Sequence, residues 1–219
     1  MTEQNMKFDK RDLILYAVTD RTWLNGRRLY DDVREAIEGG ASLIQLREKN
    51  LTHEEFKIEA LEIQKLCKNF NVPFIINDDV ELACEINADG IHVGQSDTEA
   101  GNVRALIGDE KILGVSVGNP DEAILAEKKG ADYLGAGAVF PTGSKSDAIE
   151  VSHDTLRKIC ASVKIPVVAI GGISLKNIHE LEGTGISGVA VISAIFAAEN
   201  IKAASQNLRT LSEKFFGHE

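Results

Sequence analysis

Short apolar segments alternate with longer amphipathic segments along the whole chain. The apolar segments consist mainly of Val, Ile, Leu and Ala and do not alternate strictly with polar residues. This pattern is typical of strands that are buried on both faces of a parallel sheet. Eight strands are predicted, over residues 13–18, 43–46, 74–76, 91–93, 112–117, 133–138, 167–170 and 188–192.

The amphipathic segments carry the start and stop signals of helices. One helix is predicted over residues 31–38, and a second over 52–70 opens with Thr-His-Glu-Glu, which fits a capping box. Pro120 and the two acidic residues after it predict the start of a further helix. A lysine followed by Gly130 predicts its end. The repeating unit is therefore a strand followed by a helix.

About eight such units in 219 residues predict an α/β fold, a single (β/α)8 TIM barrel. We expect residues 1–11 to form a short polar N-terminal extension and residues 12–219 to form the barrel. An open doubly wound sheet is the alternative. It receives little support, because the Gly-Ala-Gly at residues 135–137 lacks the third glycine and the following helix of a dinucleotide-binding fingerprint.

Composition and charge narrow the classes of function. The formal net charge of -10 argues against binding nucleic acid through a basic surface. No segment reaches the ~20 apolar residues of a membrane span, so we expect no membrane insertion and a cytoplasmic protein. The three cysteines, Cys67, Cys84 and Cys160, lack metal-site spacing and are predicted to be buried, reduced thiols. The sequence leaves the oligomeric state open, a homo-oligomer included.

Polar residues follow the predicted strands, at the end where a TIM barrel carries its active site. In the second strand Gln45, Arg47 and Lys49 are spaced two apart and share a face, while Leu46 points the other way. If that face is the mouth of the barrel, an amide and two cations converge there. The alternative is a solvated strand end.

Two carboxylates, Asp78 and Asp97, end neighbouring predicted strands. A hard cation such as Mg2+ takes one or two carboxylates and completes its shell with water and substrate phosphate. The sequence therefore predicts a magnesium site held by this pair. The alternative is that Asp78 caps the helix beginning near Val80, although Asp79 fits that position better.

The last two predicted strand ends resemble a phosphate cradle. Gly172 lets backbone N–H groups approach an anion, and Ile192 and Ser193 begin a helix whose N-terminus favours negative charge. The loop after the sixth strand adds further donors, at Thr142, Gly143 and Ser144. Lys145 lies between this cradle and the metal side. Two anion sites in one mouth suit the joining of two phosphorylated substrates, with loss of the metal-bound group.

Eight motifs in order resemble the thiamine-phosphate synthase (thiamine-phosphate pyrophosphorylase) family over residues 15–196. They are LYAVTDR, IQLREK, INDD, GIHVGQSD, ILGVSV, GAVFPTGSKSDA, VVAIGGI and GVAVISAIF. The resemblance implies a transferase that joins 4-amino-2-methyl-5-hydroxymethylpyrimidine diphosphate to 4-methyl-5-(2-hydroxyethyl)thiazole phosphate, giving thiamine phosphate and diphosphate. It also implies Mg2+ as the cofactor and these two small molecules as the substrates.

The resemblance implies a role for each matching residue. The pyrimidine diphosphate would contact Gln45, Leu46, Arg47, Glu48, Lys49, Asn77, Ser116 and Lys145. The thiazole phosphate would contact Thr142, Gly143, Ser144, Gly172, Ile192 and Ser193. Mg2+ would be held by Asp78 and Asp97. The catalytic residues would be Arg47, Lys49, Ser116 and Lys145. We expect Lys145→Ala to slow turnover far more than it weakens binding of the thiazole phosphate.

One residue departs from the family pattern, and three rival functions stay open. Many members carry a His where this chain has Gly118, which puts one side-chain contact near the pyrimidine in doubt. A tautomerase acting on a thiazole phosphate would need only the cradle, as would a non-catalytic sensor of phosphorylated ligands. A different phosphosugar enzyme on the same barrel is the third rival. His92 is predicted to pack at the core or mouth, with diphosphate contact as the alternative.

Overall fold

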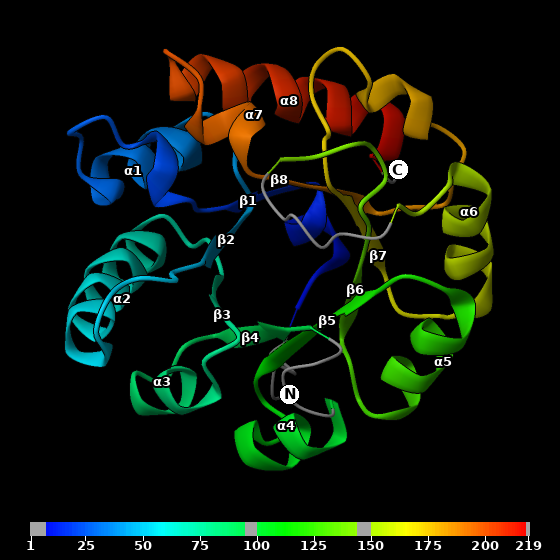
Figure 1. Cartoon of the computed structure of the whole chain (residues 1–219), viewed down its shortest axis with the longest axis horizontal. Coiled ribbons are helices and arrows are strands. Elements are labelled where there is room, and N and C mark those ends of the chain that lie inside the picture. Colours follow the sequence, from blue (N-terminus) through cyan, green and yellow to red (C-terminus); the bar gives the residue numbers. More distant parts are fainter. Residues whose placement is uncertain (1–7, 95–99, 144–149, 218–219) are drawn as a thin grey trace, which may run out of the picture.

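Eight parallel strands form a closed barrel, and helices surround it (Figure 1). The structure is a computed structural model that describes residues 8–94, 100–143 and 150–217. The strands pair in sequence order, and the last pairs with the first. They are β1 (Leu15–Val18), β2 (Leu43–Leu46), β3 (Phe74–Asn77), β4 (Gly90–Val93), β5 (Ile112–Val117), β6 (Tyr133–Ala136), β7 (Val167–Ile170) and β8 (Gly188–Val191). The predicted TIM barrel is confirmed.

The helices follow the strands in the predicted alternation, with one exception. They are α1 (Leu29–Glu38), α2 (His53–Asn69), α3 (Val80–Glu85), α4 (Ala100–Ile107), α5 (Pro120–Lys128), α6 (His153–Ser162), α7 (Ser193–Phe196) and α8 (Ile201–Phe216). Between β7 and β8 the chain forms only a 3-10 helix, η3 (Ile178–Leu181). Gly183 and Gly185, directly after η3, both have positive φ, so the chain turns where a longer helix would have to continue.

The predicted helix signals act through specific hydrogen bonds. The Thr52 hydroxyl accepts from the Glu55 backbone N–H, and the Glu55 carboxylate accepts from the Thr52 N–H, which is the expected capping box at the start of α2. Pro120 occupies the first turn of α5, which the Asn119 side chain caps at 3.0 Å from the Glu122 nitrogen. Gly130, after α5, has the left-handed φ of +90°.

Apolar side chains form two layers, one inside the barrel and one between the barrel and the helices. The inner layer includes Leu43, Ile75 and Val168, near the starts of their strands. The outer layer includes Ile44 and Leu46, which alternate with the inward residues of β2. The mouth of the barrel, at the opposite end from the inner apolar layer, is left for polar side chains.

The N-terminal segment covers the end of the barrel where the strands begin. The 3-10 helix η1 (Lys10–Leu13) leads into β1 and lies in the middle of the ring (dark blue in Figure 1). Phe8 packs against the inner layer, with its ring centroid 5.6 Å from that of Tyr133. The predicted polar extension thus contributes an apolar side chain to the barrel interior from Phe8 onward.

The structure bears on the expectations about membrane-spanning segments and about the burial of the cysteines. In the described part of the chain, every helix is too short or too polar to cross a membrane. Cys67 is buried and Cys160 is partly buried, but Cys84 is exposed, so the prediction of three buried thiols is wrong for Cys84. The reason is the helix face: on α3, Leu82 and Ala83 turn inward, which leaves Cys84 outward.

Candidate active site

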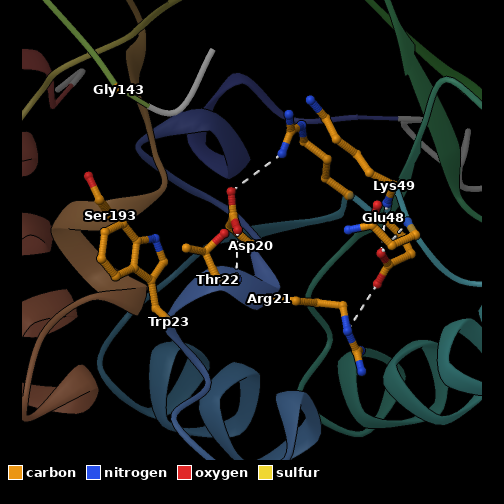
Figure 2. Close-up of a pocket in the computed structure, with 10 residues that line it drawn as sticks. Asp20, Arg21, Thr22, Trp23, Glu48, Lys49, Gly143 and Ser193 are labelled. Carbon is orange, nitrogen blue, oxygen red and sulfur yellow. Dashed lines mark hydrogen bonds and ion pairs between the residues drawn. The ribbon is translucent and has the colours of Figure 1, made fainter. Parts of the chain in front are cut away.

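A cleft of about 690 Å3 lies at the carboxyl ends of the strands (Figure 2). Its lining comes from the segments that follow β1, β2, β6 and β8. The lining residues are Asp20, Arg21, Thr22, Trp23, Arg47, Glu48, Lys49, Asn50, Gly143 and Ser193. Residues predicted for the diphosphate and for the monophosphate therefore border one cavity.

The strand alternation of β2 ends at Leu46, and the segment after it brings both predicted cations to the cleft together with Glu48 and Asn50. Gln45 is 4% exposed inside the barrel, while Leu46 lies in the outer apolar layer. Arg47 lines the cleft, and its Nη1 lies 3.4 Å from Asp20 Oδ2. The Arg47 backbone N–H also donates to Thr19 Oγ1 at 3.0 Å, which joins β2 to β1. Lys49 is exposed at the same cleft.

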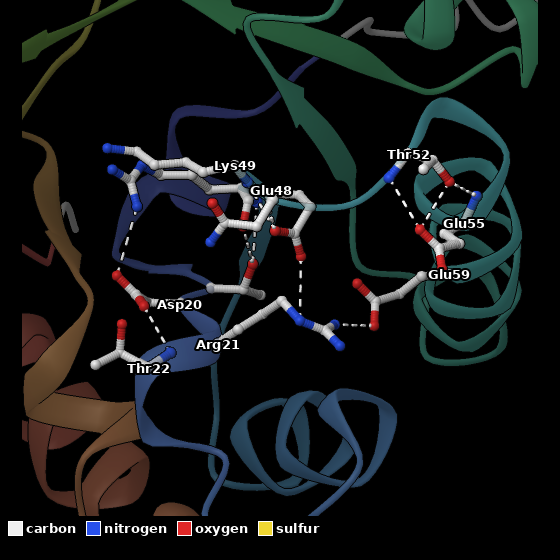
Figure 3. Close-up of polar contacts among 11 residues, drawn as sticks. Asp20, Arg21, Thr22, Glu48, Lys49, Thr52, Glu55 and Glu59 are labelled. Carbon is white, nitrogen blue, oxygen red and sulfur yellow. Dashed lines mark hydrogen bonds and ion pairs between the residues drawn. The ribbon is translucent and has the colours of Figure 1, made fainter.

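Glu48 fixes the segment that carries these cations (Figure 3). Its Oε1 accepts from the backbone nitrogens of Lys49 at 2.7 Å and Asn50 at 3.0 Å. Its Oε2 lies 3.3 Å from Arg21 Nε, and Arg21 Nη1 lies 2.6 Å from Glu59 Oε1. Burial raises the pKa of the Glu59 carboxyl, although Arg21 opposes that effect. Arg21 therefore ties the β1 segment to β2 and α2, an arrangement that the sequence did not predict.

The β3 end separates the two roles considered for its carboxylates. Asp79 caps α3, because its Oδ1 accepts from the Leu82 nitrogen at 2.8 Å, as expected. Asp78 is exposed, has a φ of +62°, and accepts from Asn77 Nδ2 at 2.6 Å through Oδ2. Neither Asn77 nor Asp78 is among the described residues that line the cleft. Asp97, the predicted second metal ligand, lies outside the described residues.

The predicted phosphate cradle is described in part. Gly143 and the exposed Ser193 line the cleft, and Ile192 precedes α7 as its N-terminal cap residue, although α7 has only 4 residues. Gly172 has a φ of +66°, and a Cβ there would lie 2.5 Å from the Pro141 oxygen, so the β6 and β7 loops approach closely. Thr142 is half-buried beside Gly143. Ser144 and Lys145 lie outside the described residues.

A buried polar chain links two predicted substrate residues, Gln45 and Ser116. Gln45 Nε2 donates to Tyr16 Oη, which lies 2.8 Å from Tyr133 Oη. Tyr133 Oη lies 2.9 Å from His92 Nδ1, and His92 Nε2 lies 3.0 Å from Ser116 Oγ. Burial raises the pKa of both tyrosines, so both keep their protons at neutral pH. His92 thus packs in the barrel interior, as the first of its two interpretations predicts.

Comparison with known proteins places the chain in a family. The family model described as thiamine monophosphate synthase matches residues 15–195. The thiamine-phosphate synthase of Clostridium tetani is 50% identical over 197 residues, which cover 90% of this chain and 94% of that protein. The thiamine-phosphate synthase of Methanobrevibacter smithii is 48% identical over 197 residues, with the same coverage of 90% and 94%.

A solved structure gives the same result. The thiamine phosphate pyrophosphorylase from Pyrococcus furiosus is 42% identical and superposes with a TM-score of 0.88, over 95% of this chain and 99% of that one. Barrel, motifs and relatives agree over nearly the whole described chain. The chain therefore belongs to the thiamine monophosphate synthase family of enzymes.

Proposed function

We propose that this enzyme joins the pyrimidine diphosphate to the thiazole phosphate to give thiamine phosphate and diphosphate. One observation carries the proposal: a single cleft is bordered by Arg47 and Lys49 on one side and by Gly143 and Ser193 on the other. Such a cleft can hold a diphosphate and a monophosphate at the same time. The names of the relatives support the same reaction.

The chemistry is the exchange of one bond at the pyrimidine methylene carbon. The carbon–oxygen bond to the diphosphate breaks, and the diphosphate leaves with the electron pair. The thiazole nitrogen then supplies its lone pair to the same carbon, so no proton has to be removed and no strong general base is needed. The aminopyrimidine ring can delocalise the positive charge on the methylene, which lets bond breaking run ahead of attack.

Arg47 and Lys49 act on the leaving group in this proposal. Negative charge grows on the diphosphate as the bond breaks, and fixed cations stabilise that charge most where water is excluded. Arg47 is held by Asp20, and its side chain is 15% exposed, so it is oriented before substrate arrives. Lys49 is exposed and can follow the diphosphate as it leaves. Ser116 and Lys145 remain proposed contacts of the same substrate.

Mg2+ is proposed on the same side, held by Asp78 and Asp97. Asp78 fits this role, because it is exposed, its carboxylate is oriented by the Asn77 amide, and Asp79 takes over the capping of α3. No group of three His, Cys, Asp or Glu side chains suited to a metal occurs in the described residues, so water and diphosphate oxygens would complete the shell. When bound, Mg2+ would neutralise charge on the diphosphate.

The thiazole phosphate is proposed to lie on the opposite side of the cleft. Gly143 offers a backbone N–H without a side chain of its own, and among the described residues other than its chain neighbours no atom lies within 4 Å of a Cβ built there. Ser193 offers an exposed hydroxyl, and Thr142 and Gly172 belong to the loops beside it. Binding both substrates in one cleft supplies the advantage of proximity, which is worth several kcal/mol in well-oriented reactions. Action in the cytoplasm belongs to the same proposal.

Incubation with both substrates tests this function. We expect mass spectrometry to detect thiamine phosphate and diphosphate in a 1:1 ratio with Mg2+, and neither product with excess EDTA. Omitting the pyrimidine diphosphate and supplying an isomer of the thiazole phosphate separates the rivals, because a tautomerase would convert that isomer without any pyrimidine substrate. A purified, folded protein that binds both ligands without turnover would favour the sensor and contradict the proposal.

A further inference from the structure

The polar chain across the barrel interior joins opposite sides of the pyrimidine site that the proposed function assigns. Gln45 on β2 is one end, and Ser116 on β5 is the other. Between them lie Tyr16, Tyr133 and His92, with exposed fractions of 1%, 0% and 9%. Because this interior is largely closed to water, the hydroxyl hydrogens of both tyrosines need protein acceptors.

Counting donors fixes the direction of the hydrogen bonds. Gln45 donates to Tyr16 Oη, so the Tyr16 hydrogen is best satisfied by donating to Tyr133 Oη. The Tyr133 hydrogen then goes to His92 Nδ1, which must lack a hydrogen. A neutral His92 therefore carries its hydrogen on Nε2 and donates it to Ser116 Oγ. With the Gln45 amide nitrogen facing Tyr16, the opposite direction would leave the buried Tyr16 hydrogen without an acceptor among the described residues.

The neighbouring strands make room for this chain. A Cβ at Gly114 would lie 2.1 Å from Tyr133 Cζ and 2.5 Å from His92 Nδ1. A Cβ at Gly135 would lie 3.1 Å from His92 Cε1. Both glycines lie in the barrel wall, on β5 and β6. The Tyr133 and His92 rings occupy the space beside these two glycines and are hydrogen-bonded to each other. The packing of the barrel wall therefore fixes the position of both rings.

We propose that Tyr16, Tyr133 and His92 are positioning residues that set the donor direction of Ser116. Because Ser116 Oγ accepts from His92, its own hydrogen is given to another acceptor, and the pyrimidine diphosphate is that acceptor in the bound state. Gln45, from across the barrel, offers its amide donor and no acceptor to Tyr16, so the Tyr16 hydrogen stays directed at Tyr133. A reversed chain would make Ser116 donate to His92 and would leave it as an acceptor toward the substrate, which is the wrong polarity for an anion.

The nitrogen NMR spectrum of His92 in the free wild-type enzyme tests the proposal without any substrate. Long-range proton–nitrogen correlations distinguish the two neutral tautomers and the imidazolium, and a His92→Gln variant assigns the signals. We expect a single Nε2–H tautomer at pH 8. A predominant Nδ1–H tautomer, or an imidazolium, would overturn the proposal. This result does not depend on turnover, so it stands or falls separately from the proposed function.

Two variants of Gln45 test whether an acceptor at this position reverses the direction of the hydrogen bonds. Gln45→Glu, measured at high pH with the ionised carboxylate verified by infrared spectroscopy, can only accept from Tyr16, so we expect His92 to change to the Nδ1–H tautomer. Gln45→Met is the size-matched control. It removes the donor but offers no acceptor, so the Nε2–H tautomer should persist. An unchanged tautomer beside the ionised glutamate would contradict the proposal.

Kinetics then tests the consequence for the substrate. Tyr133→Phe removes one hydroxyl from the chain, and Tyr30→Phe, on α1 outside the chain, is the matched control. We expect kcat/KM for the pyrimidine diphosphate to fall about tenfold in Tyr133→Phe, the scale of one lost hydrogen bond, with KM for the thiazole phosphate unchanged. An equal fall for both substrates would indicate general damage and count against positioning. A wild-type enzyme without turnover would contradict the proposed function but would not affect the tautomer result.

Discussion

At the scale of single residues, two arginines in the cleft have different partners and therefore different roles. Arg21 lies between Glu48 and Glu59, whose side chains are largely buried. Its positive charge is paired with these two carboxylates. Among the described residues, Arg47 pairs with Asp20, at 3.4 Å, which is long for a hydrogen-bonded ion pair. An arriving diphosphate can therefore compete for Arg47 far more easily than for Arg21.

This difference predicts the effect of removing Arg47. We expect Arg47→Met to lower kcat about 100-fold or more, because a fixed donor to the developing charge is lost. Lys158→Met, at an exposed cation of α6 that pairs with Asp154, is the control and should retain wild-type turnover. Steady-state product formation measures both. Equal activity in the two variants would remove Arg47 from the reaction.

The cysteines give a second prediction at this scale. Burial raises the pKa of the Cys67 thiol to about 12 and that of Cys160 to about 11, so little of either is thiolate at pH 8. Cys84 is exposed. We expect iodoacetamide to alkylate native Cys84 first, Cys160 more slowly, and Cys67 only after unfolding in urea. Peptide mass mapping over time measures the order, and Cys67 labelling as fast as Cys84 would contradict the burial of Cys67 on the inner face of α2.

At the scale of elements, the sequence predicts the helix ends that are set by hydrogen bonds between residues close together in the chain. The caps of α2 and α5 are readable, because Thr52 and Pro120 act within one turn of their own position. The 3-10 helix η3 was not predicted, since the strand-helix repeat favours a full helix between β7 and β8, whereas the chain turns at Gly183 and Gly185. Between β7 and β8, the turn residues decide the local structure and the strand-helix repeat does not.

Gly114 on β5 gives the prediction for an element. We expect Gly114→Ala to lower the free energy of unfolding by about 1–3 kcal/mol, because its Cβ would overlap the Tyr133 ring. The control is Gly101→Ala on α4, where a Cβ has only ordinary contacts, the nearest being Lys129 Cδ at 3.7 Å. That variant should gain about 0.5 kcal/mol from helix propensity. Urea unfolding compares them, and a stable Gly114→Ala would mean that the rings are not confined.

At the scale of the whole molecule, the two ends of the barrel are closed by different chemistry. The end where the strands begin holds apolar side chains, with Phe8 packed against them, and the mouth holds the charged cleft. The sequence predicts the polar residues at the mouth, because each of them directly follows a strand that can be identified from its own segment. It does not predict the chain from Tyr16 to Ser116, since that requires the register around the closed barrel.

Phe8 provides a test of how the barrel is closed at the end where the strands begin. We expect Phe8→Ala to lower the free energy of unfolding by about 1–2 kcal/mol, since a partly buried aromatic ring is removed from the inner layer. Phe70→Ala, at a ring that is 42% exposed, should cost less and serves as the control. Urea denaturation measures both. If Phe70→Ala costs as much as Phe8→Ala, the N-terminal segment contributes no specific closure.

The proposed reaction requires one cleft that holds both substrates, and a crystal structure with both bound tests this requirement most directly. Crystals of a slow variant such as Lys145→Ala, soaked with the two substrates and Mg2+, would show the positions of both anions. We predict the diphosphate beside Arg47 and Lys49 and the monophosphate beside Gly143 and Ser193, with the thiazole nitrogen facing the pyrimidine methylene. Two anions in separate cavities, or a metal remote from Asp78, would contradict the account.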